Sequence, residues 1–281
     1  MFDLDDITKQ ADQLEPLSAS ASRLLSIFSR DDWEPEEVIE VVALDEALTG
    51  RVLRLANSAS MTGHESASSV DAAVIRLGMG AVMSTAMATS MRSNLDTSLP
   101  AYELGDGAIW RHSVTSAIVA EGIHKACRGR ISQEIQTASL LHDIGKLLIA
   151  RNIDEDEAEM MGRARNEGNL DWSRAEREIL MVNHCDLGAI VAQHWSLPDS
   201  IVQAILFHHD PEQTPGDDSV RSIAFGVQLA NIGAHRIDDE PDFGEDTIES
   251  ALSNLQLSQE AFEQVLEASR EKLDEVLGCY S

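Results

Sequence analysis

The feature that most constrains the fold of this chain is the string Leu141-His142-Asp143-Ile144-Gly145-Lys146, which sets a histidine beside an aspartate within an apolar segment. Further histidines lie on or beside separate apolar segments: His112, His184, His208 and His209. Imidazole is a ligand of zinc, iron, nickel and manganese, and an adjacent carboxylate can bridge two ions or offset their charge. The pattern therefore suits a mononuclear or dinuclear metal site.

Composition and hydrophobic periodicity predict an all-α protein. Apolar residues make up 43% of the 281 residues and aromatic residues only 4%, while alanine, leucine, methionine, glutamate and serine abound. This mixture favours helices over sheets and supports a substantial core rather than general disorder. Leu48, Val52 and Leu55 illustrate the helical spacing of the apolar residues, and no segment shows the period-two alternation of a strand.

A boundary rich in proline and glycine divides the chain into two predicted helical subdomains, residues 1–98 and 105–281. In the first subdomain, Asp45 and Ser69 are expected to begin helices as N-caps, and Gly78 is expected to end one. In the second subdomain we expect helices over residues 108–127, 132–150, 174–194, 198–209, 219–235 and 258–277, and loops over 216–218 and 238–244.

The chain is strongly acidic, with 49 acidic and 21 basic side chains and a formal net charge of −28. Such a surface repels phosphate backbones and anionic membranes, so direct binding of nucleic acid or of a membrane is not expected. The same charge favours ordinary helix packing over a DNA-binding helix-turn-helix at residues 70–91. The acidic run 154–157 is interpreted as a solvated face.

Cysteine usage and the first residues predict a cytoplasmic protein. Cys127, Cys185 and Cys279 are too few and too widely spaced to indicate a disulfide framework or a zinc knuckle. Residues 1–6 are acidic where a signal peptide would be basic. No apolar run approaches the roughly 18 residues of a membrane-spanning helix. The sequence does not indicate the oligomeric state.

Several short strings carry a family resemblance. In the second subdomain they are Trp110-Arg111-His112-Ser113, the string around His142, Asn183-His184 and Phe207-His208-His209. The others are Leu44-Asp45-Glu46-Ala47-Leu48-Thr49, Leu55-Ala56-Asn57-Ser58-Ala59, Ala73-Val74-Ile75-Arg76-Leu77-Gly78, His194-Trp195-Ser196-Leu197-Pro198 and Leu229-Ala230-Asn231. The second subdomain resembles the HD superfamily of metal-dependent phosphohydrolases. Residues 13–235 together resemble HDOD proteins, the HD-related output domains of bacterial signalling, which implies an all-helical fold and a regulatory role, often without catalysis.

The resemblance also implies a set of site residues. One ion would be held by His112, His142 and Asp143, with Asn231 or water completing its ligands. A second ion would be held by His184, His208 and His209, and Asp143 would bridge the two ions. If the site is active, Lys146 could stabilise charge on a phosphate and Arg111 could orient an anionic substrate. One or two ions of iron, manganese or zinc would suit these ligands. The same residues could instead form a buried hydrogen-bond network without metal.

Two departures from the family pattern disfavour an active hydrolase. Asn231 stands where active HD enzymes place an aspartate, and its neutral amide brings no charge to offset a divalent ion. The segment Asp210-Pro211-Glu212-Gln213-Thr214-Pro215-Gly216 lacks the Gly-Tyr-Pro loop of the HD-GYP phosphodiesterases of cyclic-di-GMP.

The other histidines have simpler interpretations. Of His208 and His209, only one is expected to face the core, since they are adjacent and near a helix end. We expect His124, His194 and His235 to be hydrogen-bonded core residues.

The leading hypothesis is a bacterial regulatory protein of the HDOD type that binds a signalling protein or a nucleotide. The ligand would occupy a groove between the two helical subdomains and shift their packing. The alternative is a metal-dependent phosphohydrolase or phosphodiesterase acting on a nucleotide. A purely structural scaffold would leave the histidine series unexplained.

Overall fold

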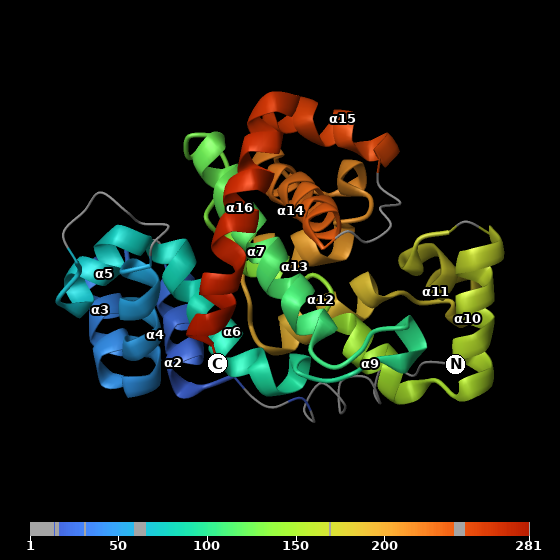
Figure 1. The fold of residues 1–281 in the computed structure, drawn as a ribbon, viewed down its shortest axis with the longest axis horizontal. Coiled ribbons are helices and arrows are strands. Elements are labelled where there is room, and N and C mark those ends of the chain that lie inside the picture. The colour runs from blue at the N-terminus through green and yellow to red at the C-terminus, as the bar shows by residue number, and fades with distance from the viewer. Residues whose placement is uncertain are drawn as a thin grey trace.

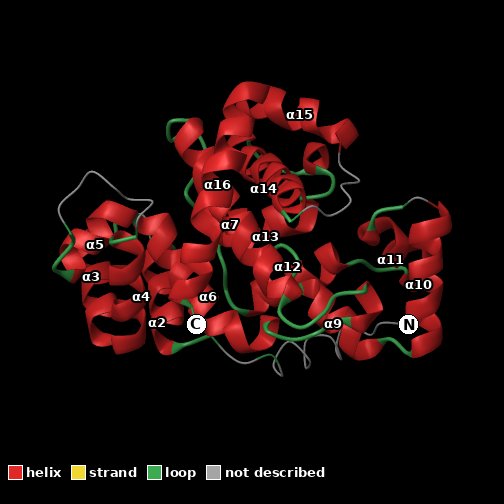
Figure 2. Ribbon diagram, in the orientation of Figure 1, coloured by secondary structure: helices red, strands yellow, loops and turns green. Residues whose placement is uncertain are grey.

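The computed structural model describes residues 14, 17–30, 32–58, 66–168, 170–238 and 245–280. Within these residues the protein is built from helices, and the one extended pairing is an isolated antiparallel bridge between Leu99 and Leu104 (Figure 2). The prediction of an all-α fold is confirmed.

The first group of helices comprises α2 (Ala19–Phe28), α3 (Pro35–Leu44), α4 (Glu46–Ala56), α5 (Val70–Leu77) and α6 (Met79–Leu95), at the left of Figure 1. The predicted caps are confirmed, because the side chain of Asp45 accepts from the backbone of Leu48 and that of Ser69 from Ala72. Gly78, at φ 80°, ends α5 and turns the chain into α6. This φ value favours glycine over residues that carry a Cβ.

The second group begins with η2 (Pro100–Tyr102), α7 (Ala108–Ala126), α8 (Glu134–Leu141), α9 (Gly145–Asn152), α10 (Glu155–Gly168) and α11 (Trp172–Leu180). It continues with α12 (His184–His194), α13 (Asp199–Phe207), η3 (Pro211–Gln213), α14 (Asp218–Ile237), α15 (Glu245–Leu255) and α16 (Gln259–Cys279). Helix α7 packs against α8, α14 and α16 and forms the centre of this group (Figure 1). The α10–α11 hairpin lies at the far side from α2–α6.

Two predicted helices are wrong because each is broken at or shortly before a site residue. The helix expected over 132–150 stops at Leu141 and restarts at Gly145, which leaves His142, Asp143 and Ile144 in the turn between α8 and α9. The helix expected over 174–194 breaks at Met181, which adopts a left-handed φ of 65°. Hydrophobic periodicity alone does not detect such breaks when both halves are apolar.

Two helices were missed. The acidic run 154–157 is the start of α10, where negative charge stabilises the first turn of a helix. Helix α15 directly follows the segment that was predicted as the loop 238–244, and residues 239–244 lie outside the described residues.

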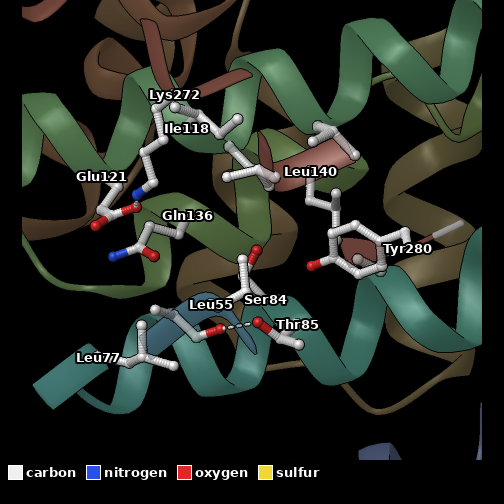
Figure 3. A pocket seen from close by; sticks show the side chains of 15 residues that line it. Leu55, Leu77, Ser84, Thr85, Ile118, Glu121, Gln136, Leu140, Lys272 and Tyr280 are labelled. Carbon is white, nitrogen blue, oxygen red and sulfur yellow. Dashed lines mark hydrogen bonds and ion pairs between the residues drawn. The ribbon is translucent and has the colours of Figure 1, made fainter. Parts of the chain in front are cut away.

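Helix α16 joins the two groups, since it lies along α7 and its end reaches α4. A small cavity of about 50 Å³ lies between the two groups of helices (Figure 3). The first group contributes Leu55, Leu77 and Thr85 to its lining, and the second group contributes residues that include Glu121, Leu140 and Tyr280. Lys272 Nζ donates to Glu121 Oε2 at 2.6 Å at its edge. No histidine lines this cavity, so the groove between the groups is not the histidine site.

Among the described residues, no single helix is both long and apolar enough to cross a membrane. Helices α5 and α6 reach that length and apolarity only as a pair, which is bent by 105°.

Candidate metal centre

The structure brings the predicted metal ligands together from five elements. They come from α7 (His112), the α8–α9 turn (His142, Asp143), the start of α12 (His184), the end of α13 (His208, His209) and α14 (Asn231). Ligand atoms of His112, His142 and Asp143 lie within 4.8 Å of one another, and those of His184, Cys185, His208 and His209 form a second such group. The two groups are called the aspartate group and the cysteine group below.

Gly145 allows the aspartate turn to approach α12. A Cβ at this position would lie 2.0 Å from the carbonyl oxygen of His184, which is far inside van der Waals contact. Only glycine therefore permits this packing, and the packing places Asp143 between the two groups. Asp143 Oδ1 lies 3.3 Å from His184 Nε2, and Oδ2 lies 3.5 Å from His142 Nε2.

Three of the imidazoles are fixed by hydrogen bonds from Nδ1. Nδ1 of His142 lies 2.7 Å from the carbonyl oxygen of Ser139, and Nδ1 of His208 lies 2.7 Å from the carbonyl oxygen of Ile205. Nδ1 of His184 lies 2.7 Å from Glu176 Oε2. Donation from Nδ1 makes Nε2 the free ligand atom, as in most histidine metal sites.

The cysteine group has the chemistry of a metal site. Nε2 of His184 and Nε2 of His208 are buried and find no hydrogen-bond partner among the described residues. Buried polar atoms are almost always paired, so these two nitrogens call for a proton, a water or an ion. Several converging imidazole nitrogens and a thiol fit a divalent transition metal.

Glu176 is a site residue that the sequence analysis missed. It is fully buried on α11 and accepts from the backbone N–H of His184 at 2.6 Å as well as from the ring. Burial lowers the pKa of His184, but the Glu176 carboxylate more than offsets this effect and the pKa lies well above its usual value. Ser173, Glu176 and Leu180 share the buried face of α11, and this spacing could have revealed Glu176 if the start of the helix had been predicted correctly.

The aspartate group is closed by its own hydrogen bonds. Lys146 Nζ donates to Asp143 Oδ2 at 2.7 Å, and His112 Nε2 lies 3.0 Å from Asn231 Oδ1. Burial raises the pKa of Asp143, but Lys146 and the nearby imidazoles hold it well below its usual value. In this half of the site, an ammonium group and an amide thus occupy the atoms that a second ion would need.

A cavity of about 270 Å³ opens over both groups. Its walls also include Tyr102, Arg165, Trp172 and Arg174, and the last three belong to the α10–α11 hairpin or its connection. The Arg165 guanidinium lies 4.8 Å from the Trp172 ring, and Trp172 meets Tyr102 edge to face at 5.0 Å. This wall of the cavity therefore combines cationic and aromatic side chains with the carboxylates of Glu103 and Asp171.

Several individual predictions are corrected. Arg111 is not among the residues that line the cavity, and its Nε pairs with Asp238 Oδ1 at 2.8 Å. Arg165 and Arg174 line the cavity instead, Arg165 paired with Glu103 at 3.9 Å and Arg174 with Asp171 at 3.7 Å, and both carboxylates also line it. His208 and His209 both reach the cavity, with ring centroids 4.3 Å apart.

The three histidines that were predicted as core residues differ from one another. His235 lines the cavity, with its ring centroid 4.6 Å from that of His112. His124 is half-buried and its Nδ1 lies 2.8 Å from the carbonyl oxygen of Ile131, so its predicted hydrogen bond is confirmed. His194 is exposed, so the prediction that it is a core residue is wrong. Asn57 is the C-cap of α4, and its side-chain amide pairs with both backbone polar groups of Ala67.

The helical fold and the buried histidine–aspartate cluster define an HD-type protein. The HDOD domain family matches residues 14–211, well over half of the chain. The chain therefore belongs to the HDOD family. A Treponema pallidum (strain Nichols) protein of uncharacterised function is 22% identical over 254 residues, which cover 89% of this chain and 48% of that protein. The chain thus spans about half the length of this relative.

Solved structures share the fold. An HDOD domain protein of unknown function from Geobacter sulfurreducens has a TM-score of 0.73 and 22% identity, covering 98% of this chain and 99% of that chain. A Marinobacter aquaeolei VT8 protein provisionally named a signal transduction protein has a TM-score of 0.70 and 20% identity, covering 100% and 61%. A Shewanella amazonensis SB2B protein provisionally named a phosphohydrolase has a TM-score of 0.67 and 23% identity, covering 96% and 97%. At these identities the likeness establishes the fold alone.

Proposed function

We propose that this chain is a cytoplasmic regulatory protein that binds one divalent transition metal and a phosphate-bearing small molecule of the nucleotide class, without hydrolysing it. The observation that carries the proposal is the unequal state of the two ligand groups. In the cysteine group, Nε2 of His184 and of His208 are buried without hydrogen-bond partners among the described residues. In the aspartate group, Lys146 occupies Asp143 Oδ2 and Asn231 occupies His112 Nε2, and only Nδ1 of His112 lacks a partner in the described part of the chain.

The cysteine group supports binding of a single ion. His184, His208 and His209 would hold it, and Asp143 stands 3.3 Å from His184 as a further oxygen ligand or a counter-charge. A bound divalent ion supplies positive charge for a phosphate and can act as a Lewis acid.

The aspartate group disfavours a second ion. Lys146 already neutralises the Asp143 carboxylate, and Asn231 offers a neutral oxygen where a carboxylate would be needed to offset further charge. Two ions that clamp both the attacking and the leaving oxygen are a frequent basis of phosphoester hydrolysis. A centre limited to one ion lacks this two-ion clamp.

The cavity wall supports a phosphate-bearing ligand with a planar ring. Arginine side chains match phosphate oxygens in geometry and charge, and aromatic faces stack on bases. Arg165, Arg174, Trp172 and Lys146 all line the cavity. Because the first three of these residues lie on the α10–α11 hairpin, a bound ligand would fix the hairpin and present it to a partner signalling protein.

The second candidate is a metal-dependent phosphohydrolase acting on a nucleotide. The observation that favours it is the position of Asp143, whose two oxygens face the two histidine groups as a bridging ligand would. In this case Lys146 would leave Asp143 and contact the phosphate.

The test is to titrate a panel of nucleotides into the metal-loaded protein by calorimetry and to assay phosphate release in the same samples. Our proposal predicts saturable binding of at least one nucleotide, no turnover, and loss of binding in His184→Ala. Phosphate release that depends on Asp143 would establish the hydrolase instead. Absence of binding across the panel would refute the nucleotide ligand.

A further inference from the structure

Cys185 lies within the metal centre. It follows His184 in the first turn of α12 and is only 2% exposed. Adjacent helical residues point roughly 100° apart, so their side chains usually serve different surroundings. Here, however, a ligand atom of each of His184, Cys185, His208 and His209 lies within 4.8 Å of all the others.

The other contacts of the Cys185 thiol do not explain its position. Outside the cysteine group, its hydrogen-bond contact is with Ser173 Oγ at 4.0 Å, the outer limit for sulfur, and within the group it hydrogen-bonds to the His184 side chain. Cys127, in contrast, donates to the carbonyl oxygen of Leu255 at 3.6 Å, far along the chain from the site. Among the cysteines, all of which are described and free, Cys185 is the one in a ligand cluster.

A second observation points to a ligand at the same place. Nε2 of His184 and Nε2 of His208 are buried and accept no hydrogen bond from the described residues. Ligands of tetrahedral zinc, at about 2.0 Å for nitrogen and 2.3 Å for sulfur, lie roughly 3.3–3.8 Å apart. The ligand atoms of the group lie within 4.8 Å of one another, so the separations would have to shorten by at most about 1.0–1.5 Å to reach this spacing.

We propose that Cys185 is a thiolate ligand of the ion held by His184, His208 and His209, and that it makes this centre selective for zinc or another thiophilic metal over magnesium and manganese. The inference rests on the metal site of the proposed function. On binding, the thiol proton is released to solvent and the sulfur electron pair bonds to the metal. Soft thiolate ligands favour zinc, whereas the aspartate group, made of imidazole and carboxylate, is harder.

The test uses the full chain, stripped of metal and reloaded with cobalt(II), an optical substitute for zinc. A thiolate ligand produces a sulfur-to-cobalt charge-transfer band in the near ultraviolet. We expect this band in the unsubstituted protein and in Cys127→Ser, and its loss in Cys185→Ser. We also expect Cys185→Ser to reduce the preference for zinc over manganese by roughly 10–100-fold, in the range known for changes around metal ligands.

X-ray absorption of the zinc-loaded, unsubstituted protein provides a measurement that does not depend on how the variant folds. One sulfur at about 2.3 Å supports the proposal. Bound zinc or cobalt without any sulfur signature overturns it but leaves the proposed metal site intact. If the unsubstituted protein binds neither ion, both the metal site and the role of Cys185 are refuted.

Discussion

Glu176 fixes His184 by two hydrogen bonds that share one carboxylate. Its Oε2 lies 2.7 Å from Nδ1 of His184 and 2.6 Å from the backbone nitrogen of the same residue, and both side chains are fully buried. This contact orients Nε2 toward the metal centre and links α11, which carries part of the cationic wall, to α12, which carries the metal ligand. The Glu176–His184 contact therefore joins the metal centre to the wall of the cavity that α11 provides.

Glu176→Gln is expected to weaken metal binding by roughly 10–100-fold, the usual effect of losing a carboxylate that orients a ligating histidine. The amide keeps the shape of the side chain but not its charge. Competitive titration with a chromophoric chelator measures the loss. Glu178→Gln, an exposed change on the same helix, is the control and should bind metal normally. Equal affinity in both variants would show that Glu176 has only a packing role.

Gly145→Ala is expected to destabilise the protein by about 1–3 kcal/mol or more, because the new methyl group meets the backbone of His184. Gly162→Ala is the matched control, since a Cβ there has no neighbour within 4 Å and lies within α10. Alanine at that position should stabilise the helix by up to about 1 kcal/mol. Urea unfolding measures both values. A similar effect of the two changes would contradict the close packing of the turn on α12.

The metal-free protein is expected to lose stability as the pH falls below about 6.5. Burial lowers the pKa of His112, His142, His208 and His209 below the ordinary value of 6.5. The unfolded chain therefore takes up protons that the native protein does not, and the free energy of unfolding falls by about 1.4 kcal/mol per pH unit for each extra proton. His184 acts in the opposite direction, since its pKa is raised and its contribution is lost only as the pH rises through that value.

Urea unfolding in chelator at pH 7.5, 6.5 and 5.5 tests this dependence. A zinc-loaded sample should be more stable than the metal-free one at pH 7.5 and should lose this advantage in acid, because protons compete with metal for the same nitrogens. Equal stability at all three pH values would mean that the imidazoles are not buried as neutral groups.

Lys146→Met is expected to open the aspartate group to a second ion, especially together with Asn231→Asp. Without the ammonium group the buried Asp143 carboxylate lacks its 2.7 Å partner, which should cost about 3–5 kcal/mol in chelator. A divalent ion should restore this stability and raise the metal content from one toward two per chain. Metal content measured with and without the changes decides the point. An unchanged content would show that Lys146 and Asn231 are not what limits the centre to one ion.

Arg165→Ala is expected to weaken nucleotide binding about tenfold or more, the usual cost of losing one charge-assisted contact to phosphate. Arg111→Ala should have no effect on binding, because Arg111 pairs with Asp238 outside the cavity. Calorimetry on the metal-loaded variants measures both. Equal losses in the two variants would place the ligand elsewhere.

Local sequence rules predicted the helical fold and the caps at Asp45 and Ser69, because capping depends on residues three positions apart. The string around His142 identified the centre but not the break between α8 and α9, since the turn is fixed by the contact of Gly145 with α12. Glu176, His235 and Arg165 were missed because their roles depend on which helices meet in space. The helical spacing of Ser173, Glu176 and Leu180 separates Glu176 from the exposed Glu178, but it does not show that Glu176 meets His184.

The most direct test of the account is elemental analysis of untagged protein purified without chelator. We predict close to one transition-metal ion per chain, retained in Asn231→Ala and lost when His184 and His208 are both replaced by alanine. An empty protein that also fails to take up zinc, iron or manganese would contradict the account. The histidines would then form a hydrogen-bonded core rather than a metal centre.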